Sequence, residues 1–167
     1  MKRAIYPGTF DPITLGHVDV VQRGLKIFDE IYVAVASGKS KTTLFTHPER
    51  ILLAKKTFSS NRNVKVIGFD GLLVNLFSRI DACAVIRGIR AVSDFDYEFQ
   101  MVLVNRRLNP AVETVFLPPS ENYFYISSSL VKNIGLNRGD VKMFVPKEVY
   151  EIIMEKFKDI LIDEAQV

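Results

Sequence analysis

The sequence predicts an α/β fold, a single domain built on a doubly wound five-stranded parallel sheet. Two observations predict it. Five short runs rich in Val, Ile, Phe and Tyr are separated by segments with helical periodicity, and several of these runs lack the alternation of a half-exposed strand. Continuous apolar strands are typical of a parallel sheet that helices cover on both faces. The alternation of strand and helix favours right-handed connections and a ligand site at the carboxyl ends of the strands.

The predicted strands are short. They comprise residues 2–6, 31–36, 64–69, 82–87 and 113–117. Cys83, the only cysteine, falls among apolar residues of the fourth run. We therefore expect a buried, unreactive thiol.

A first helix is predicted over residues 16–28, where apolar residues recur at intervals of three and four and so share one face: Val18, Val21, Leu25 and Phe28. Thr46 and Glu49 have the spacing of a capping box and predict a second helix. The longest helix is predicted from Ser93, as N-cap, to Leu108. A last helix is predicted to begin at Pro146, because proline suits a first helical turn.

Composition excludes several classes of protein. The chain has 167 residues, 48% of them hydrophobic and 25% charged, which fits one globular domain over residues 1–167 with a flexible tail at its last few residues. The net charge of +3 and the lack of long basic runs argue against a nucleic-acid-binding surface. No apolar stretch approaches the roughly 20 residues of a membrane span, and residues 1–10 lack the features of a secretory signal. A single cysteine suits a reducing compartment, so we expect a cytoplasmic protein. From the charge and the short apolar stretches, we expect neither nucleic-acid nor membrane partners.

Loops after four of the predicted strands carry basic and hydroxyl side chains. They comprise residues 9–17, 37–41, 87–90 and 118–129. The carboxyl ends of parallel strands meet at one edge of a sheet, so we expect these loops to form a convergent rim.

Common phosphate-binding and catalytic motifs are absent. Gly38-Lys39-Ser40 resembles the end of a Walker A loop, but the glycine required five positions earlier is replaced by Val33, inside a predicted strand. The dinucleotide motif G-x-G-x-x-G is also missing, as are H-E-x-x-H, G-x-S-x-G and C-x-x-C. Zinc-protease, serine-hydrolase and thioredoxin-like functions therefore lose their support.

Gly16 and His17 stand at the start of the first predicted helix. Backbone N–H groups without partners and the positive end of the helix dipole make such a position an anion site. Gly16 would let a phosphate approach the backbone, and Thr9 offers a hydroxyl at the end of the first strand. The alternative is that His17 only caps a turn.

Two motifs together resemble a known superfamily. Thr9, Asp11 and Pro12 with Gly16-His17 resemble the T/HxGH signature of nucleotidylyltransferases, and residues 126–132, ISSSLVK, resemble their second signature, ISSSxx[KR]. More narrowly, YPGTFDPITLGH, the loop of Lys41, IRGIRAVSDFDYE and ISSSLVK resemble the phosphopantetheine adenylyltransferase family over nearly the whole chain. The resemblance implies a Rossmann-like nucleotidylyltransferase fold.

The resemblance also implies a reaction, in which the adenylyl group of ATP passes to 4′-phosphopantetheine and gives dephospho-coenzyme A and pyrophosphate. The attacking phosphate oxygen is already ionised near neutral pH, so no general base is required. Catalysis then depends on positioning and on stabilising charge at the α-phosphoryl group. Mg²⁺ is expected with ATP. No residue is assigned as a metal ligand, since Asp11 before Pro12 is above all a turn former.

The resemblance assigns site residues by motif. The catalytic set is His17, Lys41 and Arg90, with His17 donating to the α-phosphate. The residues expected at 4′-phosphopantetheine are Thr9, Lys41, Leu73 and Arg87. Those expected at ATP are Thr9, Phe10, His17, Gly88, Ile89, Arg90, Glu98, Tyr123, Phe124, Tyr125, Ile126, Ser127, Ser128 and Ser129. Without the resemblance, Glu98 would be a water-facing carboxylate and the serines a simple helix cap.

Other functions stay open. A nicotinate mononucleotide adenylyltransferase would share both signatures, although the stretch RGIRAVSDFDYE points away from it. A catalytically silent nucleotide-binding module is the alternative from another class, and intact His17, Lys41, Arg87 and Arg90 argue against it. The resemblance further implies a homohexamer and feedback inhibition by coenzyme A.

Overall fold

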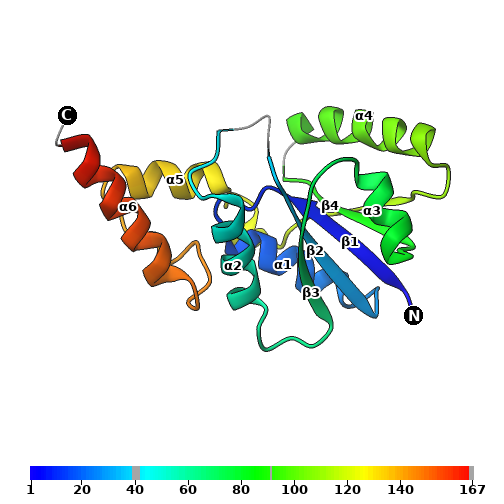
Figure 1. Ribbon diagram of the computed structural model, residues 1–167, viewed down its shortest axis with the longest axis horizontal. Coiled ribbons are helices and arrows are strands. Elements are labelled where there is room, and N and C mark those ends of the chain that lie inside the picture. Colours follow the sequence, from blue (N-terminus) through cyan, green and yellow to red (C-terminus); the bar gives the residue numbers. More distant parts are fainter. Residues whose placement is uncertain (39–41, 91, 166–167) are drawn as a thin grey trace.

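Figure 1 shows the computed structural model, in which one twisted sheet lies between layers of helices. The structure describes residues 1–38, 42–90 and 92–165. Across the sheet the strands run in the order β3-β2-β1-β4-β5, and every pairing is parallel. The predicted α/β fold is confirmed. The strands are β1 (Arg3–Gly8), β2 (Glu30–Ala36), β3 (Val64–Phe69), β4 (Ala84–Gly88) and β5 (Thr114–Leu117).

Helices connect the strands and extend the chain beyond the sheet. They are α1 (Leu15–Gly24), α2 (His47–Thr57), α3 (Leu73–Ile80), α4 (Val92–Leu108), the short 3-10 helix η1 (Glu121–Tyr123), α5 (Ser128–Leu136) and α6 (Tyr150–Ala165). In Figure 1, α5 and α6 lie at one end of the molecule and α4 at the other. No helix in the described ranges is long and apolar enough to span a membrane.

The strand order reverses next to β1. The chain moves outward from β1 to β3, then returns to the other side of β1 with β4. In an open parallel sheet such a reversal leaves a crevice outside the carboxyl ends of the two central strands. The crevice of this chain therefore lies where β1 and β4 end.

Both faces of the sheet are apolar, which explains why the strands lack alternation in sequence. Tyr6 of β1 belongs to one core together with Val20 of α1. Its neighbour Ile5 points to the opposite face and packs in a second core with Phe77 of α3. Because successive residues of a strand face opposite sides, β1 must be apolar at every position to serve both cores.

Several predicted boundaries are wrong by a few residues. α1 ends at Gly24 rather than at Phe28, and Phe28 reaches the core from a turn after the helix. α4 begins at Val92, so Ser93 is not its N-cap. α6 begins at Tyr150, because Pro146 lies in the irregular segment before it. The short α3, which follows Gly71 and has no side-chain N-cap, was not predicted as a helix.

Cys83 was expected to be buried in a strand, and this expectation is wrong. β4 begins one residue later, at Ala84, and the Cys83 side chain is exposed, with Sγ 3.3 Å from the carbonyl oxygen of Arg3. The strand boundary accounts for the difference, since Cys83 precedes β4 and is not one of the strand residues that the two cores cover.

A thiol reagent should therefore label the native protein. We expect Cys83 to react with a disulfide reagent such as 5,5′-dithiobis(2-nitrobenzoate) without denaturant, and Cys83→Ser to abolish the signal. Labelling that requires unfolding of the protein would contradict the exposed position.

Candidate active site

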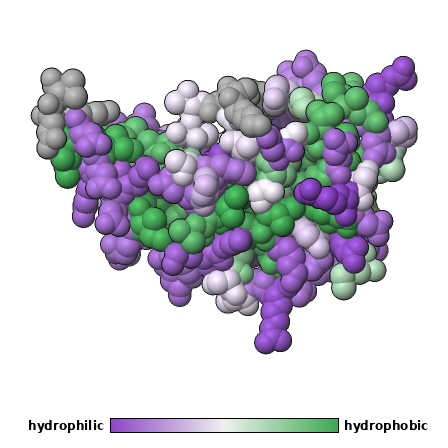
Figure 2. All heavy atoms as spheres, viewed as in Figure 1, coloured by the Kyte–Doolittle hydropathy of each residue, from purple (hydrophilic) through white to green (hydrophobic). Residues whose placement is uncertain are grey.

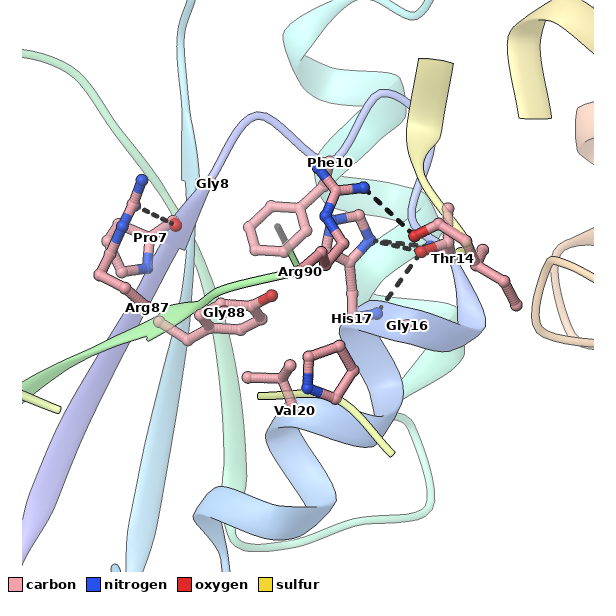
Figure 3. Close-up of a pocket in the computed structure, with 13 residues that line it drawn as sticks. Pro7, Gly8, Phe10, Thr14, Gly16, His17, Val20, Arg87, Gly88 and Arg90 are labelled. Atoms are coloured by element: carbon pink, nitrogen blue, oxygen red, sulfur yellow. Dashed lines mark hydrogen bonds between the residues drawn. The ribbon is translucent and has the colours of Figure 1, made fainter. Parts of the chain in front are cut away.

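A cavity opens at the carboxyl ends of β1 and β4, at the predicted rim (Figure 3). We call it the central cavity. β1, α1, β4 and the segment after β5 all contribute to its wall. Among its lining residues are Tyr6, Phe10, Thr14, Gly16, His17, Arg87, Gly88, Arg90, Pro119 and Ile126.

Two further hollows share residues with the central cavity. The serine cavity shares Phe10, His17 and Arg90 with it and is also lined by Thr9, Asp11, Thr42, Thr43, Ser127, Ser128, Ser129 and Lys132. The apolar groove shares Arg87 and is lined between α3 and α4 by Leu73, Tyr97, Glu98, Met101, Val102 and other residues. One polar centre thus joins a hydroxyl-rich cavity to an apolar groove, and the expected convergence of the loops after β1, β4 and β5 is confirmed.

His17 is held by Thr14, the N-cap of α1 (Figure 3). The backbone N–H of Thr14 donates to Nδ1 of His17 over 3.0 Å, and the Thr14 hydroxyl lies 3.0 Å from the same nitrogen. The backbone N–H of His17 donates back to Thr14 Oγ1 over 3.4 Å, which closes a capping box. An Nδ1 that accepts a hydrogen bond carries no proton, so neutral His17 carries its proton on Nε2. Nε2–H is therefore the donor that His17 can offer a ligand.

Two aromatic rings fix the plane of the imidazole. The Phe10 ring meets the His17 ring edge to face, with 5.0 Å between ring centroids, and Tyr6 in turn packs edge-on against Phe10 at 5.5 Å. Phe10 has a positive φ of 51°, which is uncommon for a residue with a side chain. Such strain is found where neighbouring structure dictates a conformation, often at functional sites.

Burial and, to a smaller extent, the neighbouring Arg90 guanidinium together lower the pKa of His17 to about 3. The free protein should therefore hold His17 neutral throughout the physiological range. We expect its imidazole resonances in NMR to stay unchanged between pH 8 and 5. His47→Gln would assign the signals, because the chain has only two histidines. A His17 titration midpoint near the ordinary value of about 6.5 would contradict this.

The same shift makes stability depend on pH. Between the unfolded pKa of about 6.5 and the folded pKa, only the unfolded chain binds the proton, so stability rises with pH in that window. The contribution is fully present above about pH 6.5 and is lost as the pH falls through the folded pKa. Urea unfolding should show a steeper loss toward acid pH for the wild type than for His17→Gln, which has no imidazole to titrate.

Asp11, which lines the serine cavity, joins three segments of the chain. Its carboxylate accepts from the backbone N–H groups of Leu44 at 3.0 Å and Phe45 at 2.8 Å. Lys132 of α5 completes the set with an ion pair at 2.8 Å. Asp11 is 4% exposed. Its predicted role as a turn former was thus incomplete, because it also fixes α5 and residues 44–45.

Arg50 is the largest fully buried side chain among those the structure describes. It forms hydrogen bonds to four backbone carbonyl oxygens: those of Phe45 at 3.1 Å, Thr9 at 2.6 Å, Ala36 at 2.8 Å and Ser37 at 2.9 Å. These carbonyls belong to the ends of β1 and β2 and to the segment before α2. One guanidinium thereby sets the spacing of two loops at the rim.

Arg87 and Glu98 form a two-pronged ion pair at the boundary between the central cavity and the apolar groove. The third contact of Arg87 is a donation to the Pro7 carbonyl oxygen at 3.0 Å. The guanidinium is therefore held in one orientation by a carboxylate from α4 and the end of β1. Glu98 faces Arg87 rather than water.

The segment after β5 is drawn against α1. A Cβ atom on Gly16 would lie 3.4 Å from the Ile126 carbonyl oxygen and 3.5 Å from that of Tyr123, which is van der Waals contact with both. Arg90 donates to the Ile126 carbonyl oxygen at 3.2 Å, and the Ser128 hydroxyl donates to the Pro12 carbonyl oxygen at 2.8 Å. The second signature thus lies beside the first.

Comparison with known proteins decides the family. A family model described as cytidylyltransferase-like matches residues 5–134. The chain is 52% identical over 158 residues to the phosphopantetheine adenylyltransferase of Caldanaerobacter subterraneus subsp. tengcongensis, a match that covers 95% of this chain and 99% of that protein. This chain belongs to the phosphopantetheine adenylyltransferase family. A second member, from Methylococcus capsulatus, is 51% identical over 154 residues, which is 92% of this chain and 95% of the relative.

Solved structures support the fold. The chain superposes on a proposed nicotinate-nucleotide adenylyltransferase from Vibrio parahaemolyticus with a TM-score of 0.70, covering 92% of this chain and 99% of that one. Sequence identity is 18%, so this likeness shows the nucleotidyltransferase fold alone. The Rossmann-like fold that the sequence motifs implied is confirmed.

Most residues expected from the family motifs line one of the three hollows. Ile89, Tyr123, Phe124 and Tyr125 line none of them, and Phe124 and Tyr125 are exposed. Lys41 lies outside the described residues. Lining the hollows are Thr9, Phe10, Leu73, His17, Arg87, Gly88, Arg90, Ile126, Ser127, Ser128 and Ser129. Glu98, which was expected at ATP, lines only the apolar groove.

Sequence reasoning overlooked Thr14, Arg50 and Lys132. A local signal existed for Thr14, which stands three residues before His17 at the spacing of a capping box. Lys132 was noted as the end of the second signature but was not assigned to the site. Arg50 has no local signal, because all four of its carbonyl partners come from other segments.

Proposed function

We propose that this member of the phosphopantetheine adenylyltransferase family transfers the adenylyl group of ATP to 4′-phosphopantetheine, giving dephospho-coenzyme A and pyrophosphate. The names of its relatives supply the substrate. The observation that carries the proposal is the position of His17 between a hydroxyl-rich cavity suited to a triphosphate and, beyond Arg87, an apolar groove suited to a pantetheine arm.

In this reaction a terminal phosphate oxygen of 4′-phosphopantetheine attacks the α-phosphorus of ATP. A new P–O bond forms, and the bond to the oxygen that bridges the α- and β-phosphates breaks, so that pyrophosphate leaves with the electron pair. The nucleophile is already ionised, and no base is needed. The protein contributes alignment and stabilisation of charge on the α-phosphoryl oxygens. Nε2–H of His17 is the donor we assign to this charge.

The apolar groove suits the pantetheine arm. Its walls include Leu73 from α3 and Met101 and Val102 from α4, and Arg87 lies at the end that opens toward His17. We assign the substrate phosphate to Arg87, with Thr9 and Lys41 as further partners by family resemblance. A guanidinium held by Glu98 presents its remaining donors with less loss of side-chain entropy on binding than a mobile side chain would incur.

The serine cavity suits the triphosphate. Ser127 caps α5, and its hydroxyl accepts from the backbone N–H of Leu130 at 3.0 Å, so the first turn of this helix faces the cavity beside Ser128 and Ser129. Helix N-termini favour anions. Arg90 lines both this cavity and the central cavity, which suits a contact with the phosphates next to the reacting one.

Mg²⁺ would arrive with ATP. Within the described ranges there is no cluster of three His, Cys, Asp or Glu side chains that could hold a metal ion. Both oxygens of Asp11 already serve Leu44, Phe45 and Lys132. We therefore propose that Mg²⁺ is bound through phosphate oxygens and water, the mode usual for this ion with nucleotides, and screens the negative charge of ATP.

The proposal extends to assembly, regulation and location. We propose a homohexamer with feedback inhibition by coenzyme A, acting in the cytoplasm, where its substrate ATP is supplied. An exposed apolar face supports assembly: Phe95, Phe99 and Leu103 of α4 are 41%, 44% and 52% exposed. Figure 2 shows hydrophobic residues at the surface in the part of the molecule that α4 occupies in Figure 1.

The reaction is tested with purified protein, Mg²⁺, ATP and one acceptor at a time. We expect pyrophosphate release with 4′-phosphopantetheine and little with nicotinate mononucleotide. Release only with nicotinate mononucleotide would replace the proposed acceptor, and nucleotide binding without release for either acceptor would indicate the silent module.

A further inference from the structure

A buried carboxylate of α1 is not used by the mechanism. Asp19 is 8% exposed, on the same buried side of the helix as Gly16 and Val20. None of the lysines and arginines that the structure describes forms an ion pair with it. A buried charge without a counter-ion is costly, so an apolar residue would serve packing better. Packing alone therefore does not explain a carboxylate at position 19.

The carboxylate has one specific partner, 101 residues further along the chain. One oxygen of Asp19 accepts from the backbone N–H of Ser120 over 2.8 Å, and the other accepts from the Ser120 hydroxyl. Two charge-assisted hydrogen bonds to a single residue fix both its distance and its orientation.

Ser120 begins the segment that forms one wall of the central cavity. Pro119 and Ile126, on either side of η1, both line that cavity. The far end of the segment is held by Arg90, which donates to the Ile126 carbonyl oxygen. The near end is held by Asp19. Because α1 also carries Gly16 and His17, the Asp19–Ser120 contact couples the helix of the proposed catalytic residue to the adjoining wall.

We propose that Asp19 is a positioning residue, which through Ser120 sets the wall of the nucleotide site at residues 119–126 against α1. The inference rests on the proposed function, in which ATP binds with its α-phosphate at His17, in the cavity that Pro119 and Ile126 of this wall also line. Neither Asp19 nor Ser120 lines the central cavity, the serine cavity or the apolar groove. Loss of the contact should therefore weaken ATP binding indirectly and leave the binding of 4′-phosphopantetheine largely unchanged.

The test uses Ser120→Ala, Asp19→Asn and the double variant in the full chain. We expect Ser120→Ala and Asp19→Asn each to raise the Kd for MgATP in calorimetry and the KM for ATP by about 10-fold, which corresponds to about 1.4 kcal/mol. The KM for 4′-phosphopantetheine should stay within about twofold. In the double variant the effects should fall well short of the product of the single ones, because both changes remove one interaction.

Two controls separate positioning from a general loss of structure. Ser120→Thr keeps the hydroxyl and should restore most of the ATP affinity. Ser59→Ala removes an exposed serine hydroxyl that donates to the Lys56 carbonyl oxygen at 2.9 Å, and it should change neither KM. Melting temperatures identify a variant that fails to fold. If Asp19→Asn or the double variant does not fold, the ATP affinity of Ser120→Ala, the milder change, tests the inference.

The outcomes distinguish this inference from the proposed function. A wild type that binds MgATP but releases no pyrophosphate with 4′-phosphopantetheine would overturn the function, while calorimetry would still measure the effect of the Asp19–Ser120 contact on nucleotide affinity. An active wild type whose Ser120→Ala and Asp19→Asn variants bind ATP normally would overturn the inference. So would equal increases in both KM values, which would indicate a merely structural role.

Discussion

His17→Ala should lower kcat by about 100- to 1000-fold, the usual cost of removing one donor that stabilises charge in a transition state. The KM for ATP should change by less than about threefold, because a donor that acts mainly in the transition state contributes little to substrate binding. Steady-state pyrophosphate release and calorimetry with MgATP measure the two effects. Normal turnover by this variant would remove His17 from the mechanism.

His17→Gln is the matched control for that prediction. A glutamine side chain can place an N–H donor near the position of Nε2, the nitrogen that carries the proton because Nδ1 accepts from Thr14. We therefore expect Gln to retain more of the rate than Ala. If both variants were equally slow, the imidazole would have a role that a simple donor cannot replace, and the assignment of Nε2–H would be incomplete.

The arrangement of the sheet could be predicted from the sequence because its causes are local. A strand such as β2, with apolar side chains on both faces, carries its environment in its own composition. Because strands alternate with helical segments along the chain, only a few topologies of the sheet are possible. Helix ends were less accurate. Phe28 matched the period of α1 but packs from a turn, and the eight residues of α3 offered neither length nor a cap to predict it.

The candidate active site could likewise be predicted only in part. Its position at the carboxyl ends of β1 and β4 could be predicted, since topology determines which loops meet. The contacts that hold the loops in place could not be predicted from the sequence. Asp11 meets Lys132 across 121 residues, and Asp19 meets Ser120 across 101. No pattern in either segment indicates the other. Such pairs depend on the folded distance between segments, which periodicity and spacing do not contain.

Arg50 is the strongest case of a residue that only the structure explains. Burial lowers its pKa, an effect that the nearby Asp11 carboxylate opposes, and the guanidinium is satisfied by backbone carbonyls alone among the hydrogen bonds described. Each of these carbonyl groups would otherwise be buried or half-buried close to strand ends. Removing the donor leaves them without that partner, and an unsatisfied buried polar group costs about 1–3 kcal/mol.

Arg50→Met should therefore reduce the free energy of unfolding by about 3 kcal/mol or more, as expected for loss of a buried hydrogen-bond network. Methionine keeps much of the volume of the side chain, so the loss would reflect the missing donors rather than a cavity. Arg50→Lys keeps the charge but only one nitrogen, and it should fall between the wild type and Arg50→Met. Urea unfolding followed by circular dichroism gives the midpoints.

Arg62→Met provides the matched comparison, since Arg62 is exposed and surface substitutions usually change stability by less than about 0.5 kcal/mol. The Arg50 variants should also bind 4′-phosphopantetheine more weakly. Arg50 holds Ser37 and Phe45, the two sides of the segment that carries Lys41, in addition to Thr9. An Arg50→Met protein as stable as Arg62→Met would show that the four carbonyl groups find other partners, and that the spacing of these loops is set elsewhere.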